Sequence, residues 1–261
     1  MRRWRLVDAD WNSWPDGLSI AETFSQAAGL ELAGIELGVY DAAVELAPGR
    51  LAELTRCAAD SGVAVTDVLL SLPTERWPQG ALSGEPERLL AQVRACAEMC
   101  RDLGLPVLGL WPGADPPGAE VVAPLRRCVE AAGEVRIALE YKPGTVVADA
   151  AEALALCEQV EGLGVLLDTG HAYAAGEDPA EVVERLGDSL LHVHLGDAGP
   201  GGSDDDLPCG RLHDFASLLA ALEASYRGTA AFDLYGAVSA GLLTGADAVR
   251  ESRDHLLSRA V

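Results

Sequence analysis

The chain has 261 residues, of which 49% are hydrophobic and 23% charged, and it is long enough for one large globular domain. It carries 41 acidic and 19 basic residues, which gives a formal net charge of −22. Because a polyanion is repelled by such a field, nucleic acid is disfavoured as a partner.

Six cysteines are present, without a Cys-x-x-Cys pair. We expect them to be reduced and to pack as small hydrophobic side chains, although Cys96 and Cys100 are one helical turn apart and leave a thiol-specific metal open. Reduced thiols and the lack of a signal-peptide pattern predict a cytoplasmic protein. Asp233 and several glycines interrupt the apolar segment 230–246, so no membrane span is expected.

Eight strand-then-helix units follow one another along the chain. Strand-like runs begin near residues 6, 34, 63, 107, 135, 163, 190 and 230. Helical patterns follow at about 19–29, 49–61, 86–103, 118–132, 147–160, 179–187, 213–225 and 244–259. Eight alternations in a chain of this length predict an α/β protein, a single-domain (β/α)8 TIM barrel over residues 1–261. A doubly wound open sheet is the alternative, but no Gly-x-Gly-x-x-Gly follows the first strand.

Proline and glycine mark the predicted ends of elements. Prolines at expected helix starts are Pro48, Pro86 and Pro179, and glycines at expected helix ends are Gly29, Gly62 and Gly104. Long loops rich in Pro, Gly and Asp follow three predicted strands, at 72–84, 112–118 and 196–212. In a barrel these loops gather at the carboxyl face, where TIM-barrel active sites lie.

Polar residues stand where four successive predicted strands end. Asp168 closes the fully apolar run 164–167, where a buried carboxylate is costly unless a cation meets it. The equivalent residues of the other strands are Glu140, His194 and Asp233. Because consecutive strands are neighbours in a barrel, the four are expected to line one arc of its mouth. Three carboxylates and one imidazole suit Mn²⁺, Mg²⁺, Co²⁺ or Zn²⁺.

Each of these residues also has a simpler interpretation. Glu140 alone fits an arginine partner, and Asp168 before Thr-Gly fits a turn or a helix N-cap. His194 alone fits a buried core histidine, a role that His192 can take instead. Asp233 alone fits a strand-end surface acid. Their coincidence at the same end of successive strands favours the metal site.

The segments around these strand ends resemble the xylose isomerase-like TIM barrel superfamily. The resemblance rests on LEYKP at 139–143, DTGH at 168–171, HVHLGD at 192–197 and FDLY at 232–235, and extends to GIEL at 34–37 and LPCGR at 207–211. The group includes sugar phosphate isomerases and epimerases, ketose 3-epimerases, inosose and dehydroshikimate dehydratases, and endonuclease IV. The endonuclease branch fits less well, because it uses histidines on early strands and this chain has none before His171.

The resemblance implies one divalent metal ion per chain, with Mn²⁺ favoured. The implied ligands are Glu140, Asp168, His194 and Asp233. The implied catalytic residues are Glu140, His171, Lys142 and Asp233, with His171 contacting a substrate oxygen and Lys142 lying beside metal and substrate. The superfamily usually has Glu where this chain has Asp233. The shorter side chain is less suited to the proton-abstracting base that epimerases place there.

Further residues are candidates for holding a substrate or a loop. His171 and Trp111 are expected substrate contacts, although Trp111 also fits core packing. Glu36 fits either a hydroxyl contact or a tie for the strand-two loop, and Arg211 a phosphate contact. Asp197 resembles the acid that ends the strand-seven motif, where it supports a ligand or holds the loop.

The resemblance implies a metal-dependent isomerase or epimerase of a sugar, sugar phosphate or sugar derivative, in carbohydrate metabolism. A divalent ion that chelates a carbonyl and its neighbouring hydroxyl stabilises the enediolate formed when a carboxylate or histidine moves the adjacent proton. Two alternatives stay open: a metal-dependent dehydratase (lyase) of a cyclic polyol or keto acid, and an inactive sugar-binding barrel. The expected partner is a small carbohydrate-like molecule. Because members of the superfamily often form dimers, a homodimer is also possible for this chain.

Overall fold

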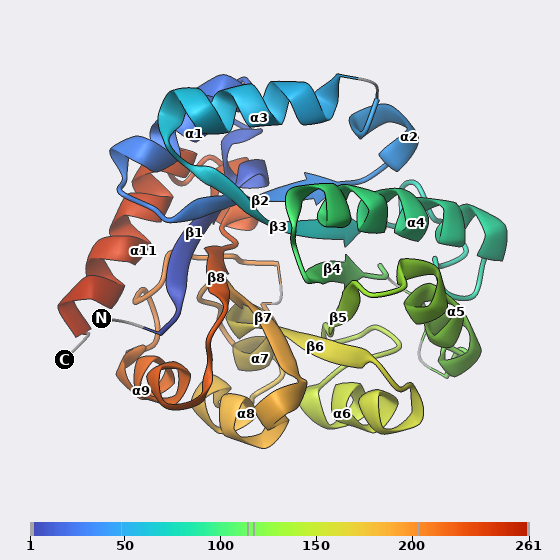
Figure 1. The fold of residues 1–261 in the computed structure, drawn as a ribbon. Helices are drawn as coiled ribbons and strands as arrows, with labels where there is room; N and C mark the ends of the chain where they lie inside the picture. Colours follow the sequence, from blue (N-terminus) through green and yellow to red (C-terminus); the bar gives the residue numbers. More distant parts are fainter. Residues whose placement is uncertain (1–2, 48, 114, 117, 203, 260–261) are drawn as a thin grey trace.

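The computed structural model describes residues 3–47, 49–113, 115–116, 118–202 and 204–259. In this part of the chain, eight parallel strands close into a barrel in sequence order (Figure 1). The strands are β1 (Arg5–Ala9), β2 (Gly34–Val39), β3 (Ala64–Ser71), β4 (Val107–Trp111), β5 (Arg136–Glu140), β6 (Leu163–Asp168), β7 (Leu190–Leu195) and β8 (Thr229–Phe232). The predicted (β/α)8 barrel is confirmed, and the open-sheet alternative is wrong.

Helices form the layer outside the barrel (Figure 1). The longer ones are α1 (Ile20–Gly29), α3 (Arg50–Ser61), α4 (Pro86–Leu103), α5 (Val122–Ala132), α6 (Ala150–Gln159), α8 (Pro179–Leu186), α9 (Ala216–Ser225) and α11 (Gly245–Arg259). Five short helical segments were not predicted: η1 (Asp10–Ser13), α2 (Ala42–Glu45), α7 (Thr169–Ala174), η2 (Gly187–Ser189) and α10 (Tyr235–Ser239). Each is too short to produce a helical hydrophobic period in the sequence.

The predicted helix ends agree with the structure at most positions. Pro86 and Pro179 are the first residues of α4 and α8, where their missing N–H groups leave no helical bond unmade. Gly62 and Gly104 follow α3 and α4 with φ of 75° and 72°, a left-handed conformation that glycine adopts without strain. Pro48 lies outside the described residues.

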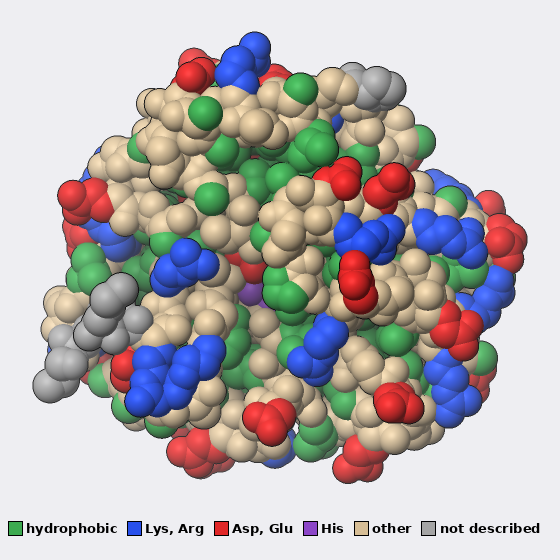
Figure 2. All heavy atoms as spheres, in the orientation of Figure 1, with side chains coloured by type: hydrophobic (Ala, Val, Ile, Leu, Met, Phe, Trp, Pro, Cys, Tyr) green, Lys and Arg blue, Asp and Glu red, His purple; other side chains and the backbone are tan. Residues whose placement is uncertain are grey.

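Apolar side chains form a large core between the barrel and the helices, and a smaller cluster inside the barrel. The inner cluster consists of Ala9, Trp11, Leu69, Ala138 and Leu166. Polar groups share the barrel interior, and acidic and histidine side chains are visible at the centre of the face in Figure 2. The six cysteines are free thiols, and five of them are buried. None of the helices in the described ranges has the length and apolar character needed to cross a bilayer.

Candidate metal centre and active site

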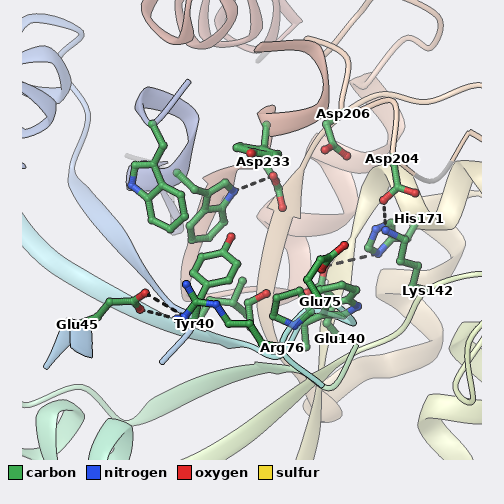
Figure 3. Close-up of a pocket in the computed structure, with 17 residues that line it drawn as sticks. Tyr40, Glu45, Glu75, Arg76, Glu140, Lys142, His171, Asp204, Asp206 and Asp233 are labelled. Atoms are coloured by element: carbon green, nitrogen blue, oxygen red, sulfur yellow. Dashed lines mark hydrogen bonds and ion pairs between the residues drawn. The ribbon is translucent and has the colours of Figure 1, made fainter. Parts of the chain in front are cut away.

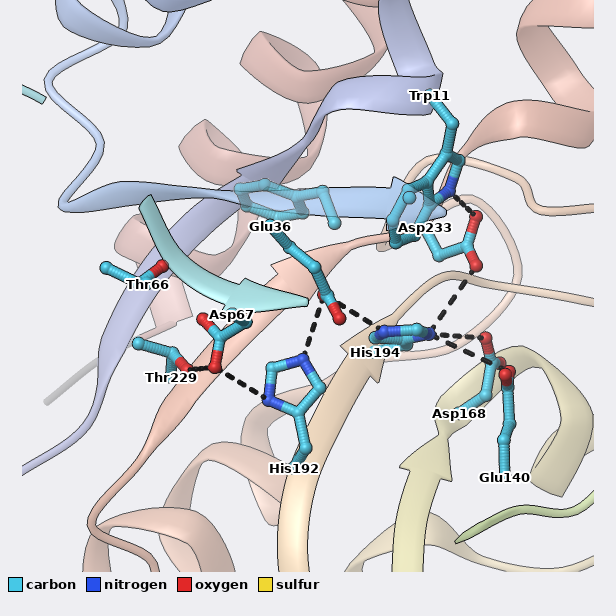
Figure 4. A network of polar contacts seen from close by, with 12 residues as sticks. Trp11, Glu36, Thr66, Asp67, Glu140, Asp168, His192, His194, Thr229 and Asp233 are labelled. Atoms are coloured by element: carbon cyan, nitrogen blue, oxygen red, sulfur yellow. Dashed lines mark hydrogen bonds and ion pairs between the residues drawn. The ribbon is translucent and has the colours of Figure 1, made fainter. Parts of the chain in front are cut away.

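Strand register brings the four predicted ligands to one face. The register partner of Glu140 on β6 lies two residues before Asp168, so the two side chains share a face of the sheet. Asp168 pairs directly with His194, whose own partner on β8 lies two residues before Asp233. All four side chains therefore turn toward the barrel interior at its carboxyl end (Figure 4).

His194 lies between the three carboxylates, as Figure 4 shows. Its Nδ1 is 3.5 Å from Asp233 Oδ2, 3.7 Å from Glu140 Oε1 and 3.9 Å from Asp168 Oδ2. One ligand atom from each of the four residues lies within 4.8 Å of the others. Glu140, Asp168 and His194 are buried, and the Asp233 side chain is 17% exposed.

The His194 Nδ1 atom shows that these residues fit a cation. It is buried and has no hydrogen-bond partner among the described residues, because its three carboxylate neighbours are beyond hydrogen-bond range. Buried polar atoms are normally paired, and several acids facing one another repel unless a positive charge lies between them. A divalent ion with oxygen and imidazole ligands satisfies both requirements.

Proton affinities in the cluster reflect the same crowding. Burial raises the pKa of Asp233 to about 6, and Asp168 and Glu140 add to the rise while His194 opposes it. Burial also acts to raise the pKa of Glu140, but the His194 ring outweighs it and holds that pKa below its usual value. For His194, the Glu36 and Glu140 carboxylates outweigh the effect of burial and raise the pKa well above its usual value.

Asp168 also caps the helix that follows its strand. Its Oδ1 accepts a hydrogen bond from the His171 N–H at 2.9 Å, and so caps α7, as its position before Thr-Gly indicated. Its Oδ2 faces the His194 ring at 3.9 Å. The N-cap and the metal-site interpretations therefore describe different oxygens of one carboxylate.

His171 extends the site from the first turn of α7. Its Nδ1 lies 2.9 Å from the Tyr141 carbonyl oxygen, which can only accept, so Nδ1 carries the hydrogen. The same nitrogen is 3.5 Å from Glu140 Oε1. The Nε2 atom is thereby left as the ring nitrogen that can accept a proton from a ligand.

Lys142 and Trp111 lie together at one side of the site. The Lys142 ammonium is 5.4 Å from the centre of the Trp111 ring and forms an ion pair with Asp204 (Figure 3). Burial lowers the pKa of Lys142, but its hydrogen bond and ion pair with Asp204 outweigh that effect and raise it.

A cavity of about 590 Å³ opens above the cluster. It is lined by Trp11, Trp14, Tyr40, Glu45, Leu69, Ser71, Pro73, Glu75, Arg76, Trp111, Glu140, Lys142, His171, Asp204, Asp206, Asp233 and Tyr235 (Figure 3). Of the four cluster residues, Glu140 and Asp233 line this cavity, whereas Asp168 and His194 are not among the side chains that reach it. Two carboxylates are thus accessible both to an ion and to a ligand.

The structure does not place Glu36 and Arg211 in the cavity, which corrects two substrate-contact assignments. Glu36 is fully buried and binds His192 and His194 instead. Arg211 lies outside the cavity lining and pairs with Glu251 on α11. Both residues have a suitable strand or loop position in the sequence, but their partners come from distant parts of the chain.

The loop 196–212 reaches the carboxyl face as predicted. Asp197 is buried and accepts hydrogen bonds from the Leu212 and His213 N–H groups, so it holds the two ends of this loop together. Asp206 from the same loop lines the cavity and accepts a hydrogen bond from Gly236 N–H at 2.8 Å. Sequence reasoning missed Asp206, because nothing in the acidic run 204–206 distinguishes one acid from the next.

Asp233 is held by a residue that the sequence analysis also missed. Trp11 Nε1–H donates to Asp233 Oδ1 at 2.8 Å, while Oδ2 faces His194. Trp11 is the second residue of η1, which follows β1 directly, and it lies beside β8 because the barrel closes there. The only available signal was its position shortly after a predicted strand.

Comparison with known proteins shows the family and the fold of this chain. The sequence model of the xylose isomerase-like TIM barrel family matches residues 24–259. An inosose dehydratase from Geobacillus kaustophilus is 27% identical over 127 residues, which are 48% of this chain and 32% of the dehydratase. That match therefore spans about a third of the relative's length.

Solved structures share the fold over nearly the whole chain. D-allulose 3-epimerase from Methylomonas sp. superposes with a TM-score of 0.76 at 19% identity, covering 100% of this chain and 99% of the epimerase. The probable 3-DHS dehydratase AsbF from Bacillus anthracis has a TM-score of 0.76 at 16% identity, covering 98% and 100%. The IOLI protein with a bound zinc atom has a TM-score of 0.72 at 18% identity, covering 98% and 97%. With the family match extending over most of the sequence, this chain belongs to the xylose isomerase-like TIM barrel family.

Proposed function

We propose that this protein is a divalent-metal-dependent isomerase or epimerase that removes a proton next to the carbonyl of a sugar-like substrate. The observation that carries the proposal is the Nδ1 atom of buried His194, which has no hydrogen-bond partner among the described residues and faces three carboxylates beneath a cavity of about 590 Å³. The zinc in the IOLI relative and the epimerase activity in the name of another relative support the same assignment.

Glu140, Asp168, His194 and Asp233 are the residues that would hold the ion. When bound there, it would polarise a substrate carbonyl and stabilise the negative charge that develops on proton removal. The protein's own part is to hold and move protons. His171 offers Nε2 to a substrate oxygen, and the Lys142 ammonium steadies negative charge at the cavity wall.

Two carboxylates reach the cavity, and this feature favours inversion at carbon. Glu140 extends from β5 and Asp233 from the end of β8, so they approach a ligand from different strands. One of them can take a proton from one face of a carbon while the other returns a proton to the opposite face. The Trp11 hydrogen bond fixes the shorter Asp233 side chain for this task.

The cavity favours a substrate without a phosphate group. Both basic residues of the described lining have acidic partners. Arg76 lies 3.8 Å from Glu45, and Lys142 forms an ion pair with Asp204. The acidic side chains in the described lining are Glu45, Glu75, Glu140, Asp204, Asp206 and Asp233. An additional anion would enter a field that is already negative, whereas sugar hydroxyls find many acceptors.

Deuterium exchange tests the proposal. The protein loaded with Mn²⁺ is incubated with ketohexoses in D₂O, and the sugars are analysed by NMR and mass spectrometry. We expect a recovered isomer with one deuterium at the reacting carbon. We also expect D233N to abolish interconversion but retain exchange from one epimer, provided that it still binds metal. A metal-loaded protein that exchanges no hydrogen with any polyol or sugar tested would contradict the assignment.

A dehydratase is the second candidate, because the curated relative that matches in sequence is an inosose dehydratase. In this case one carboxylate removes the proton, and His171, protonated at Nε2 before the step, gives that proton to the departing hydroxyl, which leaves as water. An unsaturated or enone product in the same incubation, without a recovered isomer, would favour this reaction.

A further inference from the structure

A buried carboxylate lies directly behind the metal-facing histidine. Glu36 of β2 is fully buried, and its Oε2 is 3.1 Å from His194 Nε2 and 2.9 Å from His192 Nε2 (Figure 4). Its Oε1 has no hydrogen-bond partner in the described part of the chain. The polar contacts of this side chain are therefore directed at the two imidazoles of β7.

The contact determines which nitrogen of His194 carries a hydrogen. A carboxylate oxygen only accepts, so His194 Nε2 must donate to Glu36. In the neutral ring the lone pair is then on Nδ1, the atom that faces Glu140, Asp168 and Asp233. The same hydrogen bond prevents the ring from turning to present Nε2 instead.

Glu36 is itself held from the opposite side. His192 Nε2 donates to the same Oε2, and His192 Nδ1 lies 3.6 Å from Asp67 Oδ1. Asp67 also accepts the hydroxyl hydrogen of Thr229 at 2.7 Å. The chain of contacts runs from the metal-facing ring through the barrel interior (Figure 4).

The contact lengths favour hydrogen bonding over a second ion in this group. Glu36, His192 and His194 also present three donor atoms close together. However, both imidazole contacts to Glu36 have ordinary hydrogen-bond lengths, and the cluster is 0–3% exposed. An ion placed here would also have to displace the Nε2 hydrogen of His194.

We propose that Glu36 is the positioning residue of the metal centre: it fixes the tautomer and orientation of His194 so that Nδ1 is the ligating atom, with His192 as its buttress. This inference rests on the metal site of the proposed function, but not on the identity of the reaction. Carboxylates that orient metal-binding histidines typically contribute 10–100-fold to metal affinity.

Metal titration of E36Q tests the role. Glutamine keeps the size of the side chain and a carbonyl oxygen that can accept from both imidazoles, but it removes the negative charge that strengthens these two hydrogen bonds. We expect the dissociation constant for Mn²⁺ and Zn²⁺, measured by calorimetry, to rise by about 10–100-fold. E158Q, on the exposed face of α6, is the matched control and should bind like the wild type. Wild-type affinity in folded E36Q would overturn the proposal.

A measurement on the wild type avoids the risk that E36Q does not fold. The protein is labelled with ¹⁵N-histidine and titrated with diamagnetic Zn²⁺, and H194N identifies the His194 signals. We expect the Nδ1 resonance of His194 to move while its Nε2 keeps its hydrogen. Loss of the Nε2–H signal, or a second zinc equivalent that H192N removes, would overturn the proposal. Because neither readout needs turnover, an inert protein with the expected titration would contradict the proposed reaction and leave this inference intact.

Discussion

The two halves of the barrel contribute different chemistry to one cavity. Strands β5 to β8 supply the polar cluster Glu140, Asp168, His194 and Asp233. Strands β1 to β4 and their following segments supply most of the aromatic wall, Trp11, Trp14, Tyr40 and Trp111. We call these the ligand half and the wall half.

The halves also treat their buried acids differently. In the wall half, Asp10 accepts from Gly38 N–H at 2.9 Å and Asp8 accepts from the Asn12 side chain at 2.9 Å. In the ligand half, carboxylates face one another and an imidazole without hydrogen bonds between them. Acids that accept hydrogen bonds from nearby backbone or side-chain groups stabilise the connection after a strand. Acids that face one another repel, and a cation between them relieves this repulsion. The second arrangement is the one expected of a functional site.

The largest expected effect is the loss of metal binding in D168A, which removes a ligand from the ligand half. We expect metal affinity to fall by more than about 100-fold, since a direct ligand contributes more than a residue that orients one. Metal analysis and calorimetry on the purified protein measure it. D149A is the control, because Asp149 caps α6 as Asp168 caps α7 but lies outside the cluster. One bound ion per chain in D168A would refute the ligand assignment.

The wall half predicts a pH dependence of stability. Burial raises the pKa of Asp8 and of Asp10 to about 7, from 3.8. The folded state therefore binds these protons more tightly than the unfolded state does. The resulting stabilisation is complete below about pH 4 and is lost as the pH rises to 7, at most about 4 kcal/mol per group.

Asparagine at position 10 stays neutral and can still accept from Gly38. We compare the unfolding free energies of D10N and the wild type by urea denaturation at pH 4 and pH 8. The difference in favour of D10N should be roughly 2 kcal/mol larger at pH 8 than at pH 4. D16N, at an exposed acid that accepts from Gly245 N–H, is the control. Parallel pH profiles for D10N and the wild type would show that Asp10 is already ionised in the folded state.

A third test asks whether the acidic residues of the cavity disfavour a negatively charged ligand. We expect D-fructose 6-phosphate to bind the metal-loaded protein at least about tenfold more weakly than D-fructose, because both cavity cations are paired with acids. D204N frees Lys142 and should narrow this difference, while D205N, next to it but outside the cavity lining, should not. Tighter binding of the phosphate ester to the wild type would contradict the preference for an uncharged substrate.

The smallest effect is expected for the aromatic wall. W111A should raise KM by about fivefold with little change in kcat, because ring stacking contributes roughly 1 kcal/mol to binding. W111F keeps a ring face and should recover most of the affinity. Steady-state kinetics on the substrate identified by exchange separates the two parameters. A fall in kcat at unchanged KM would instead assign Trp111 to positioning Lys142, which lies over its ring.

The sequence by itself determined the fold and most of the ligand half. Strand ends are visible where an apolar run stops at a polar residue, as at Leu167–Asp168 or Leu139–Glu140. In a parallel barrel such ends meet at one face, so residues far apart in sequence could be grouped without coordinates. Proline and glycine also located the ends of helices, because their effect on the backbone depends only on their own position in the chain.

Only the tertiary structure decided the partners across the barrel. Glu36 meets the β7 histidines, and Trp11 meets Asp233, across more than 150 residues of sequence. These contacts depend on barrel closure and on side-chain directions inside it, and neither leaves a periodic signal in the chain. The sequence does not show whether a side chain faces solvent, a ligand or a buried imidazole. This holds for a run of acids, a lone tryptophan and a glutamate within a strand. The choice among these comes from three-dimensional burial and pairing, because the energy of a polar group depends on what surrounds it.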